Sequence, residues 1–296
     1  MEKPKVYFTR EITPENVVKL YELLNKPLKG NIAVKVHSGE KGNENYLRPE
    51  FMKPMVEHVN GTIVECNTAY GDAWGGERDT TNKHLKVIEE HGWNKYFKVD
   101  LMDAEGPDIE IEIPNGKVLK KDILGKNIEN YDSMLVISHF KGHPAGGYGG
   151  ALKQLSIGCA SSRGKALIHS GGKSDDRFKC WEYEDQNAFL ESMADTASAV
   201  FNYFKGNMAF INVMCNLSVD CDCTINAEAP CMKDIGILAS LDPIAIDQAC
   251  IDLVMASSDP GKDHFMERVN SRNGIHTIEA AAELGFGSRE YELIEL

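Results

Sequence analysis

Short apolar runs that alternate with amphipathic helical stretches constrain the fold of this chain more than any other feature. Runs typical of buried strands cover residues 31–36, 62–66, 133–138 and 208–214, and the strongest helical pattern begins at Asp242-Pro243. Strands joined by helices run parallel and are covered on both sides. We therefore expect an α/β fold with a mostly parallel mixed sheet and helices on both faces.

The remaining pattern completes this prediction without a repeat, a low-complexity tract or a clear linker. Further strands are expected at 6–8, 236–239 and 291–294, a short extended segment at 166–169, and a hairpin from 109–113 to 118–119 with a tight Asn115-Gly116 turn. Further helices are expected at 14–24, 49–59, 81–91, 150–159, 186–204, 262–270 and 277–284. We expect residues 1–296 to form a single α/β domain, with two interleaved lobes around a cleft as the alternative.

A glycine-rich segment between a strand and a helix is the strongest candidate for a functional site. It reads HFKGHPAGGYGGALK from His139 to Lys153 and follows the apolar run 134–137. Glycine loses more backbone entropy on folding than any other residue, so several together indicate backbone that bends sharply or lies close to a ligand. A turn that only lets the helix pack tightly on the sheet is the alternative.

The residue types in this segment suggest two kinds of chemistry. Backbone N–H groups at a helix N-terminus favour negative charge, so we expect a small anionic ligand there. Its predicted binding residues are Gly146, Gly147, Gly149, Gly150 and Lys153. The predicted catalytic residues are His139, His143 and Lys141, because imidazole transfers protons near neutral pH. The spacing matches neither the P-loop nor the dinucleotide fingerprint, so a nucleotide is not indicated.

Two cysteines separated by one residue form a second candidate site. Cys221 and Cys223 flank Asp222, and residues two apart in an extended segment point to the same side. Both thiols could therefore bind one metal ion, iron or zinc, with Cys215 and Cys231 as the nearest further thiols. The chain has no CxxC motif, the spacing common in zinc and iron–sulfur sites. The alternative is that both thiols pack as small apolar groups.

Polar loops after two other predicted strands are weaker candidates, since ligands of open α/β sheets lie beyond the carboxyl ends of strands. In residues 37–43, Glu40 could act as a base, although a polar surface loop is the simpler interpretation. In residues 70–79, Arg78 could bind a carboxylate or phosphate through two nitrogens. Asp247 is expected to face solvent or a neighbouring loop.

The composition restricts the class of protein. A formal net charge of −13 at pH 7 argues against nucleic acid, which binds mainly through Lys and Arg, and against an anionic membrane surface. No stretch approaches the roughly 18 apolar residues of a membrane span, and no signal peptide follows Met1. We expect a cytoplasmic protein whose eight cysteines are thiols or ligands and not disulfides. The oligomeric state does not follow from the sequence.

Several motifs, in this order, resemble one family over nearly the whole chain. They are AVKVHSGEKGNENYLRP, HFKGH, GGALKQLSIGCASSRGK, CDC and DIGILASLDPIAIDQACIDLV. This combination is similar to the uncharacterised iron–sulfur centre protein family, domain of unknown function number 362. The resemblance implies a shared α/β fold and a common site built around HFKGH and CDC, without an established reaction.

The chain departs from this family at one place. Many members carry a ferredoxin-like insert with two cysteine-rich cluster motifs after the segment that matches residues 168–171. Here residues 173–185 (KSDDRFKCWEYED) hold Cys180 as their single cysteine, whereas a [4Fe–4S] cluster takes four thiolates. Ferredoxin-type [4Fe–4S] clusters are therefore not expected.

Two functional hypotheses follow from these observations. The first is a metal-binding enzyme or redox component, such as an oxidoreductase, of small-molecule metabolism. Cys221 and Cys223 would bind the metal, and His139 or His143 would complete the site or transfer protons. The second is a non-catalytic module that has lost its electron-transfer insert and binds a small anion, in which Lys153 matters and the thiols do not.

Overall fold

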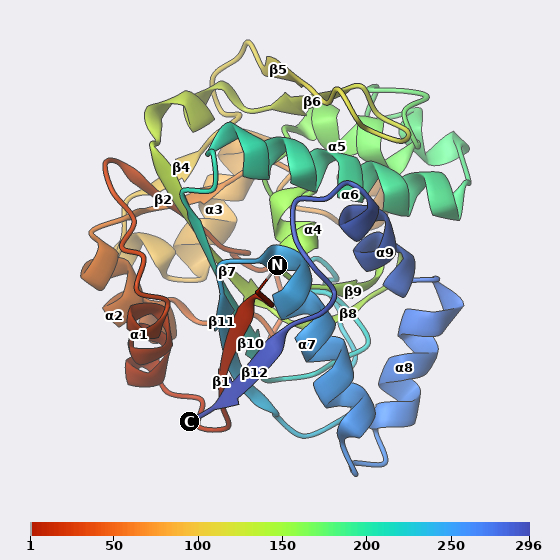
Figure 1. The fold of residues 1–296 in the computed structure, drawn as a ribbon. Helices are drawn as coiled ribbons and strands as arrows, with labels where there is room; N and C mark the ends of the chain where they lie inside the picture. The colour runs from red at the N-terminus through yellow and green to blue at the C-terminus, as the bar shows by residue number, and fades with distance from the viewer. Residues whose placement is uncertain (1) are drawn as a thin grey trace.

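The computed structural model describes residues 2–296 and contains an eight-stranded sheet in the order β12-β1-β11-β10-β7-β2-β3-β4 (Figure 1). Its strands are β1 (Lys5–Thr9), β2 (Ile32–Lys35), β3 (Thr62–Glu65), β4 (Val99–Leu101), β7 (Ser133–His139), β10 (Met208–Met214), β11 (Gly236–Ser240) and β12 (Glu292–Glu295). β11 runs antiparallel to both neighbours, and the other adjacent pairs are parallel. The mostly parallel mixed sheet is as predicted.

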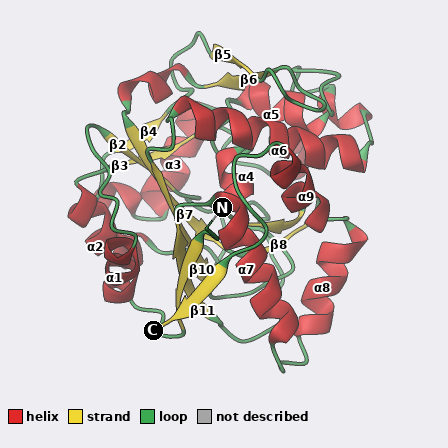
Figure 2. Cartoon of the chain, viewed as in Figure 1, coloured by secondary structure: helices red, strands yellow, loops and turns green. Residues whose placement is uncertain are grey.

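Helices cover both faces of this sheet (Figures 1 and 2). One face carries α1 (Pro14–Leu23), α2 (Pro49–Val59) and α3 (Thr81–Glu90). The other carries α4 (Ala151–Leu155), α6 (Gln186–Tyr203), α7 (Pro243–Ala256), α8 (Lys262–Ser271) and α9 (Ile275–Glu283). In β7, Leu135 and Ile137 belong to the first apolar core, and Met134 and Val136 to the second. A strand buried on both faces explains the continuous apolar runs in the sequence.

Helix boundaries follow local chemistry that the sequence displays. The Thr13 hydroxyl accepts a hydrogen bond from the Asn16 N–H, and proline occupies the next position, where its missing N–H has no cost. Asp242 caps α7 in the same way, through the N–H groups of Ile244 and Ala245. These two starts match the predictions.

The prediction of a short extended segment at residues 166–169 is wrong. These residues form the second half of α5 (Ser162–His169). The Ser161 hydroxyl accepts from the Gly164 N–H and starts the helix. An apolar run of only three residues carries no period, so the sequence pattern could not separate strand from helix.

The hairpin exists with a different partner strand. β5 (Ile109–Glu112) pairs with β6 (Lys121–Leu124), and residues 113–120 form the connecting loop. The buried carboxylate of Asp195, on α6, accepts three backbone N–H bonds of 2.7 Å from Lys117, Val118 and Leu119. Asp195 thus fixes residues 117–119 in the loop, so that the second strand of the hairpin begins only at Lys121. A local turn pattern in the sequence does not show such a distant contact.

The glycine-rich segment folds as a small hairpin, β8 (Lys141–His143) and β9 (Gly147–Gly149), before a helix α4 that is shorter than predicted. The remaining elements are single-turn or short 3₁₀ helices: η1 (Asp72–Trp74), η2 (Trp93–Lys95), η3 (Lys126–Asn130) and η4 (Cys180–Glu182). Across residues 2–296, no helix combines the length and the apolar character that crossing a membrane requires.

Candidate functional site

Four adjacent parallel strands end at one edge of the sheet and direct their loops to the same place. In the order β10-β7-β2-β3, they are followed by the cysteine loop 215–235, the hairpin 140–149, residues 36–48 and residues 66–80. The carboxyl edge of an open α/β sheet is where ligands bind. The candidate segments 37–43, 70–79, 139–149 and 215–231 therefore meet at this edge.

The structure brings the histidine segment and the cysteine loop into direct contact. The Gly142 N–H donates to the Ser218 carbonyl over 2.8 Å. A Cβ at position 142 would lie 2.4 Å from the Val219 carbonyl oxygen, so only glycine allows the two backbones to approach this closely. The glycine in HFKGH thus serves the junction between the two predicted site segments.

A buried charged trio anchors the cysteine loop. Asp222 lies 2.8 Å from His139 Nδ1 and 2.8 Å from Lys141 Nζ. Burial opposes the charged carboxylate, but His139 and Lys141 hold the pKa of Asp222 well below its usual range. The second ring nitrogen of His139 lies 2.6 Å from the Cys215 carbonyl oxygen. His139 and Lys141, two of the three predicted catalytic residues, are therefore engaged with the protein itself.

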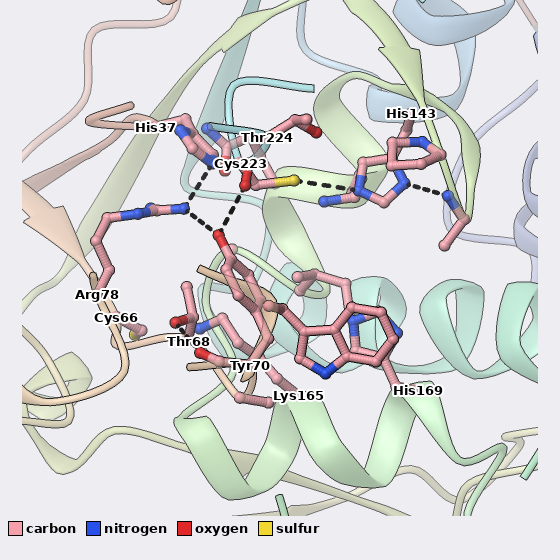
Figure 3. A pocket seen from close by; sticks show the side chains of 18 of the residues that line it. His37, Cys66, Thr68, Tyr70, Arg78, His143, Lys165, His169, Cys223 and Thr224 are labelled. Carbon is pink, nitrogen blue, oxygen red and sulfur yellow. Dashed lines mark hydrogen bonds between the residues drawn. The ribbon is translucent and has the colours of Figure 1, made fainter. Parts of the chain in front are cut away.

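His143, Cys221 and Cys223 form a compact cluster. Figure 3 shows His143 and Cys223 of this cluster. The ligand atoms of all three residues lie within 4.8 Å of one another, and the His143 Nε2 to Cys223 Sγ distance is 3.7 Å. Although burial opposes the thiolate, a hydrogen bond from Cys223 and the charges of Lys141 and Lys153 hold the pKa of Cys221 well below its usual range. The hydrogen bond to Cys221 raises the pKa of Cys223. A nitrogen and two sulfurs of this kind could hold a metal ion.

The hydrogen bonds of His143 determine which ring nitrogen carries the proton. Burial and the charge of Lys153 lower the pKa of His143 to about 4, so its ring is neutral at pH 7. Nδ1 accepts from the backbone N–H groups of Ala145 and Gly146, at 3.1 and 2.8 Å. The proton of a neutral ring is then on Nε2, the atom that faces the sulfurs. In this arrangement His143 donates to sulfur, and the two sulfurs are the groups with free lone pairs.

A cavity of about 420 Å³ opens beside the cluster. In Figure 3, Cys223 and His143 lie at one end, and His169 and Lys165 at the other. The sequence-predicted residues that line it are His143, Lys153, Cys223 and Arg78. His139, Lys141 and Gly146–Gly150 do not line it.

The N-terminus of α4, where a small anionic ligand was predicted, already contacts an anionic group of the protein itself. The buried Asp247 carboxylate accepts from the N–H groups of Ala151 and Leu152, at 2.7 and 3.0 Å. A Cβ at position 150 would lie 2.4 Å from Asp247 Oδ1, so Gly150 makes room for this carboxylate. The expectation that Asp247 faces solvent or a neighbouring loop is wrong.

Arg78 likewise finds its carboxylate within the chain. Its Nε donates to Glu40 Oε2 at 3.2 Å, and its Nη2 donates to the Tyr70 hydroxyl at 3.0 Å. That hydroxyl also lies 3.1 Å from the Cys223 carbonyl oxygen (Figure 3). Glu40 is fully buried and also accepts from backbone N–H groups, so it is neither a free base nor part of a surface loop. These contacts brace the wall behind Cys223.

Sequence reasoning missed the aromatic end of the cavity. Trp74, Trp181 and His169 line it, and the Trp181 ring centroid lies 4.9 Å from that of His169. Trp181 lies within residues 173–185, the place where many family members carry the ferredoxin-like insert, and His169 precedes this segment. Its aromatic residues, together with Trp74 in residues 70–79, are the sequence signals that could have indicated this end of the cavity.

The fold and the cluster together define an α/β protein with a candidate metal-binding group of one histidine and two cysteines at the carboxyl edge of its sheet. The chain belongs to the family described as domain of unknown function (DUF362), whose family model matches residues 32–252. No curated protein matches the chain.

Two solved structures show a distant likeness. One is the lactate racemase apoprotein from Thermoanaerobacterium thermosaccharolyticum, with 14% identity and a TM-score of 0.43 over 70% of this chain and 50% of that one. The other is a protein from Thermotoga maritima, with 10% identity and a TM-score of 0.40 over 91% of this chain and 58% of that one. The chain thus spans between half and three fifths of these proteins, and both alignments are too distant to carry a function.

Proposed function

We propose that the protein is a metal-dependent enzyme or redox component of small-molecule metabolism whose metal, iron or zinc, is held by Cys221 and Cys223. The observation that supports this proposal is the convergence of both sulfurs and His143 Nε2 within 4.8 Å beside a cavity. A metal there would supply Lewis-acid or electron-transfer chemistry. Eight free cysteines suit a reducing compartment such as the cytoplasm.

The chain's own residues would tune this site in three ways. Two thiolates are soft ligands, and the cavity leaves further coordination positions to a small molecule. Lys141 and Lys153 offset the negative charge that two thiolates bring to a buried site. His143 Nε2–H donates to sulfur as an outer hydrogen bond, which weakens the electron donation of that thiolate. Coordination by His143 itself would require its backbone donors at residues 145 and 146 to move.

Metal content after anaerobic purification tests the proposal. We expect about one metal ion per chain in the wild type and a loss of roughly 90% or more in Cys221→Ser/Cys223→Ser. Cys231→Ser is the matched control, since Cys231 lies in the same loop, is half-buried, and its Sγ donates to the Leu217 carbonyl at 3.2 Å, away from the cluster. Metal that is equally low in the wild type, or unchanged in the double variant, would refute the proposal.

The proton on His143 Nε2 favours one alternative, a metal-free nucleophile in which the Cys221 thiolate is stabilised by His143. This alternative predicts that iodoacetamide alkylates Cys221 in metal-free protein at pH 6 at least about 10-fold faster than Cys231. Replacing His143→Ala should slow the alkylation of Cys221 and leave that of Cys231 unchanged. Equal rates at the two cysteines would exclude it.

A further inference from the structure

The cavity beside the thiols contains an unpaired ammonium group on helix α4. Lys153 is half-buried, and its Nζ has no hydrogen-bond or ion-pair partner among the side chains that the structure describes within residues 2–296. An ammonium group that is partly removed from water interacts most strongly with a charged acceptor. Lys153 therefore favours a ligand that brings a negative charge into the cavity.

The other basic groups of the cavity are already engaged. Arg78 donates to Glu40 and Tyr70, and Lys165 Nζ donates to the Ala160 carbonyl at 2.6 Å. Lys153 is therefore the basic residue of this lining that remains available to a ligand. Its charge lowers the pKa of both His143 and His169, so it lies within electrostatic range of both ends of the cavity.

The mouth of the cavity is aromatic. Trp74 is 68% exposed, and its ring centroid lies 6.3 Å from that of Trp181. Trp181 packs on His169, which in turn stacks on Phe189 with centroids 4.8 Å apart and planes 12° apart. An exposed indole beside a second indole offers flat apolar surface, which favours a planar apolar partner over a compact polar one.

We propose that this cavity binds an aromatic carboxylate, with the carboxylate on Lys153 Nζ and the ring packed against Trp74 and Trp181. A carboxylate supplies the acceptor that Lys153 lacks, in a charge-assisted hydrogen bond. A volume of about 420 Å³ lies in the range of small-molecule sites. This inference rests on the proposed function for the identity of the site, since Cys223 and His143 line the same cavity, but the binding does not require a bound metal.

Calorimetric titration of the full chain with three probes of similar size tests whether binding needs the carboxylate charge and whether it needs a planar ring. The probes are trans-cinnamate, its neutral amide cinnamamide, and 3-cyclohexylpropionate, which keeps the charge without a planar ring. We expect cinnamate to bind at least about 10-fold more tightly than cinnamamide and about 2–10-fold more tightly than the cyclohexyl acid. No saturable binding of cinnamate up to millimolar concentration, or equal affinity for the amide, would overturn the inference.

Variants locate the site. Lys153→Met should weaken cinnamate about 10-fold and leave cinnamamide unchanged, while Lys98→Met, an exposed lysine outside this cavity, should change neither. Trp181→Ala should weaken both aromatic probes about 2–10-fold, whereas Phe178→Ala, 78% exposed and not part of the lining, should have no effect. If Lys153→Met and Trp181→Ala bind the probes as their control variants do, cinnamate binds elsewhere and the assignment is refuted.

The same titration on Cys221→Ser/Cys223→Ser separates this inference from the proposed function. Cinnamate that binds to a double variant whose metal content equals that of the wild type supports the inference and refutes the metal site. If the metal content instead depends on the two cysteines and the wild type does not bind cinnamate, the metal site is supported and the inference is refuted.

Discussion

Asp122 is a buried carboxyl group that the fold leaves poorly satisfied. It is 1% exposed, its Oδ1 accepts from the Ile123 N–H, and its Oδ2 has no hydrogen-bond partner within residues 2–296. Burial raises the pKa of Asp122 to about 8, against the small opposing effects of that N–H and of Lys165. The folded protein therefore holds this group as a neutral acid over a range where an unfolded chain ionises.

The sign of the resulting pH dependence follows from linkage. Below about pH 4 both states are protonated, and Asp122 has no effect on the pH dependence of stability. Between about pH 4 and pH 8 only the unfolded state loses the proton, so the free energy of unfolding falls as pH rises. Above about pH 8 both states are ionised, so the free energy of unfolding no longer changes with pH through Asp122.

Asp122→Asn removes this ionisation. We expect the substitution to raise the free energy of unfolding by about 1–3 kcal/mol at pH 8 and to change it little at pH 4, measured by urea unfolding. Asp263→Asn, at an exposed position of α8, is the control and should be neutral at both pH values. A gain of equal size at pH 4 would show that the effect of Asp122 does not come from its ionisation.

Asp222 is expected to matter for stability because it neutralises buried positive charge. Asp222→Asn leaves Lys141, whose side chain is 4% exposed, without its carboxylate, and should lower the free energy of unfolding by about 3–5 kcal/mol. The more exposed pair of Asp220 and Arg268 provides the comparison, and Asp220→Asn should cost about 1 kcal/mol. Equal losses for the two variants in urea unfolding would argue against the anchoring role of the trio.

At the scale of elements, helix α4 depends on a carboxylate from another helix. Asp247, on α7, accepts from the two first N–H groups of α4 and from Asn212 Nδ2 at 2.8 Å. The Tyr148 hydroxyl donates a fourth bond at 3.2 Å. A five-residue helix has little stability of its own, so this cap and its packing hold it in place.

Asp247→Ala should therefore destabilise more than the loss of an ordinary N-cap. We expect about 3 kcal/mol or more in urea unfolding, because several buried donors lose their acceptor together. Asp185→Ala, which removes the single exposed cap bond of α6 to the Ala188 N–H, should cost about 1 kcal/mol. Similar costs for the two variants would mean that α4 is held by packing alone.

Asp242 and Asp247 show what the sequence can and cannot reveal about a helix. Asp242 precedes a proline and an apolar helix, so its capping role is visible in five consecutive residues. Asp247 sits within the same helix and acts on residues 151 and 152, nearly a hundred positions away. Asp195 acts on the loop 113–120 over a similar separation. Contacts of this kind exist only after the chain has folded, and no local pattern marks them.

At the scale of the molecule, the order of the strands separates the edge strand from the site. Among the described strands β12 pairs only with β1, and β1 and β11 lie between it and β10. Deleting residues 292–296 should lower the free energy of unfolding by about 1–2 kcal/mol, because the removed residues are mostly exposed. Metal content and cinnamate affinity should remain those of the full chain. A change in either would show that the sheet couples its edge to the site.

The alternation of strands and helices was sufficient to predict the layers and the mostly parallel sheet, since period and helix caps are local signals. Because parallel strands direct the loops that follow them to one edge of the sheet, the sequence could also predict that the histidine and cysteine segments lie close together. The roles of individual residues could not be read in the same way. His139 and His143 lie four residues apart in one motif, yet one faces a carboxylate and a carbonyl while the other faces sulfur.

The carboxylate of Asp247 has a further consequence for any molecule that enters the cavity. Because Asp247 already occupies the N-terminal end of α4, an anion in the cavity meets the ammonium group of Lys153 in place of a cradle of backbone N–H groups. Attraction of that strength weakens in physiological salt and permits rapid departure. The affinity of the cavity for an anion should therefore fall as ionic strength rises.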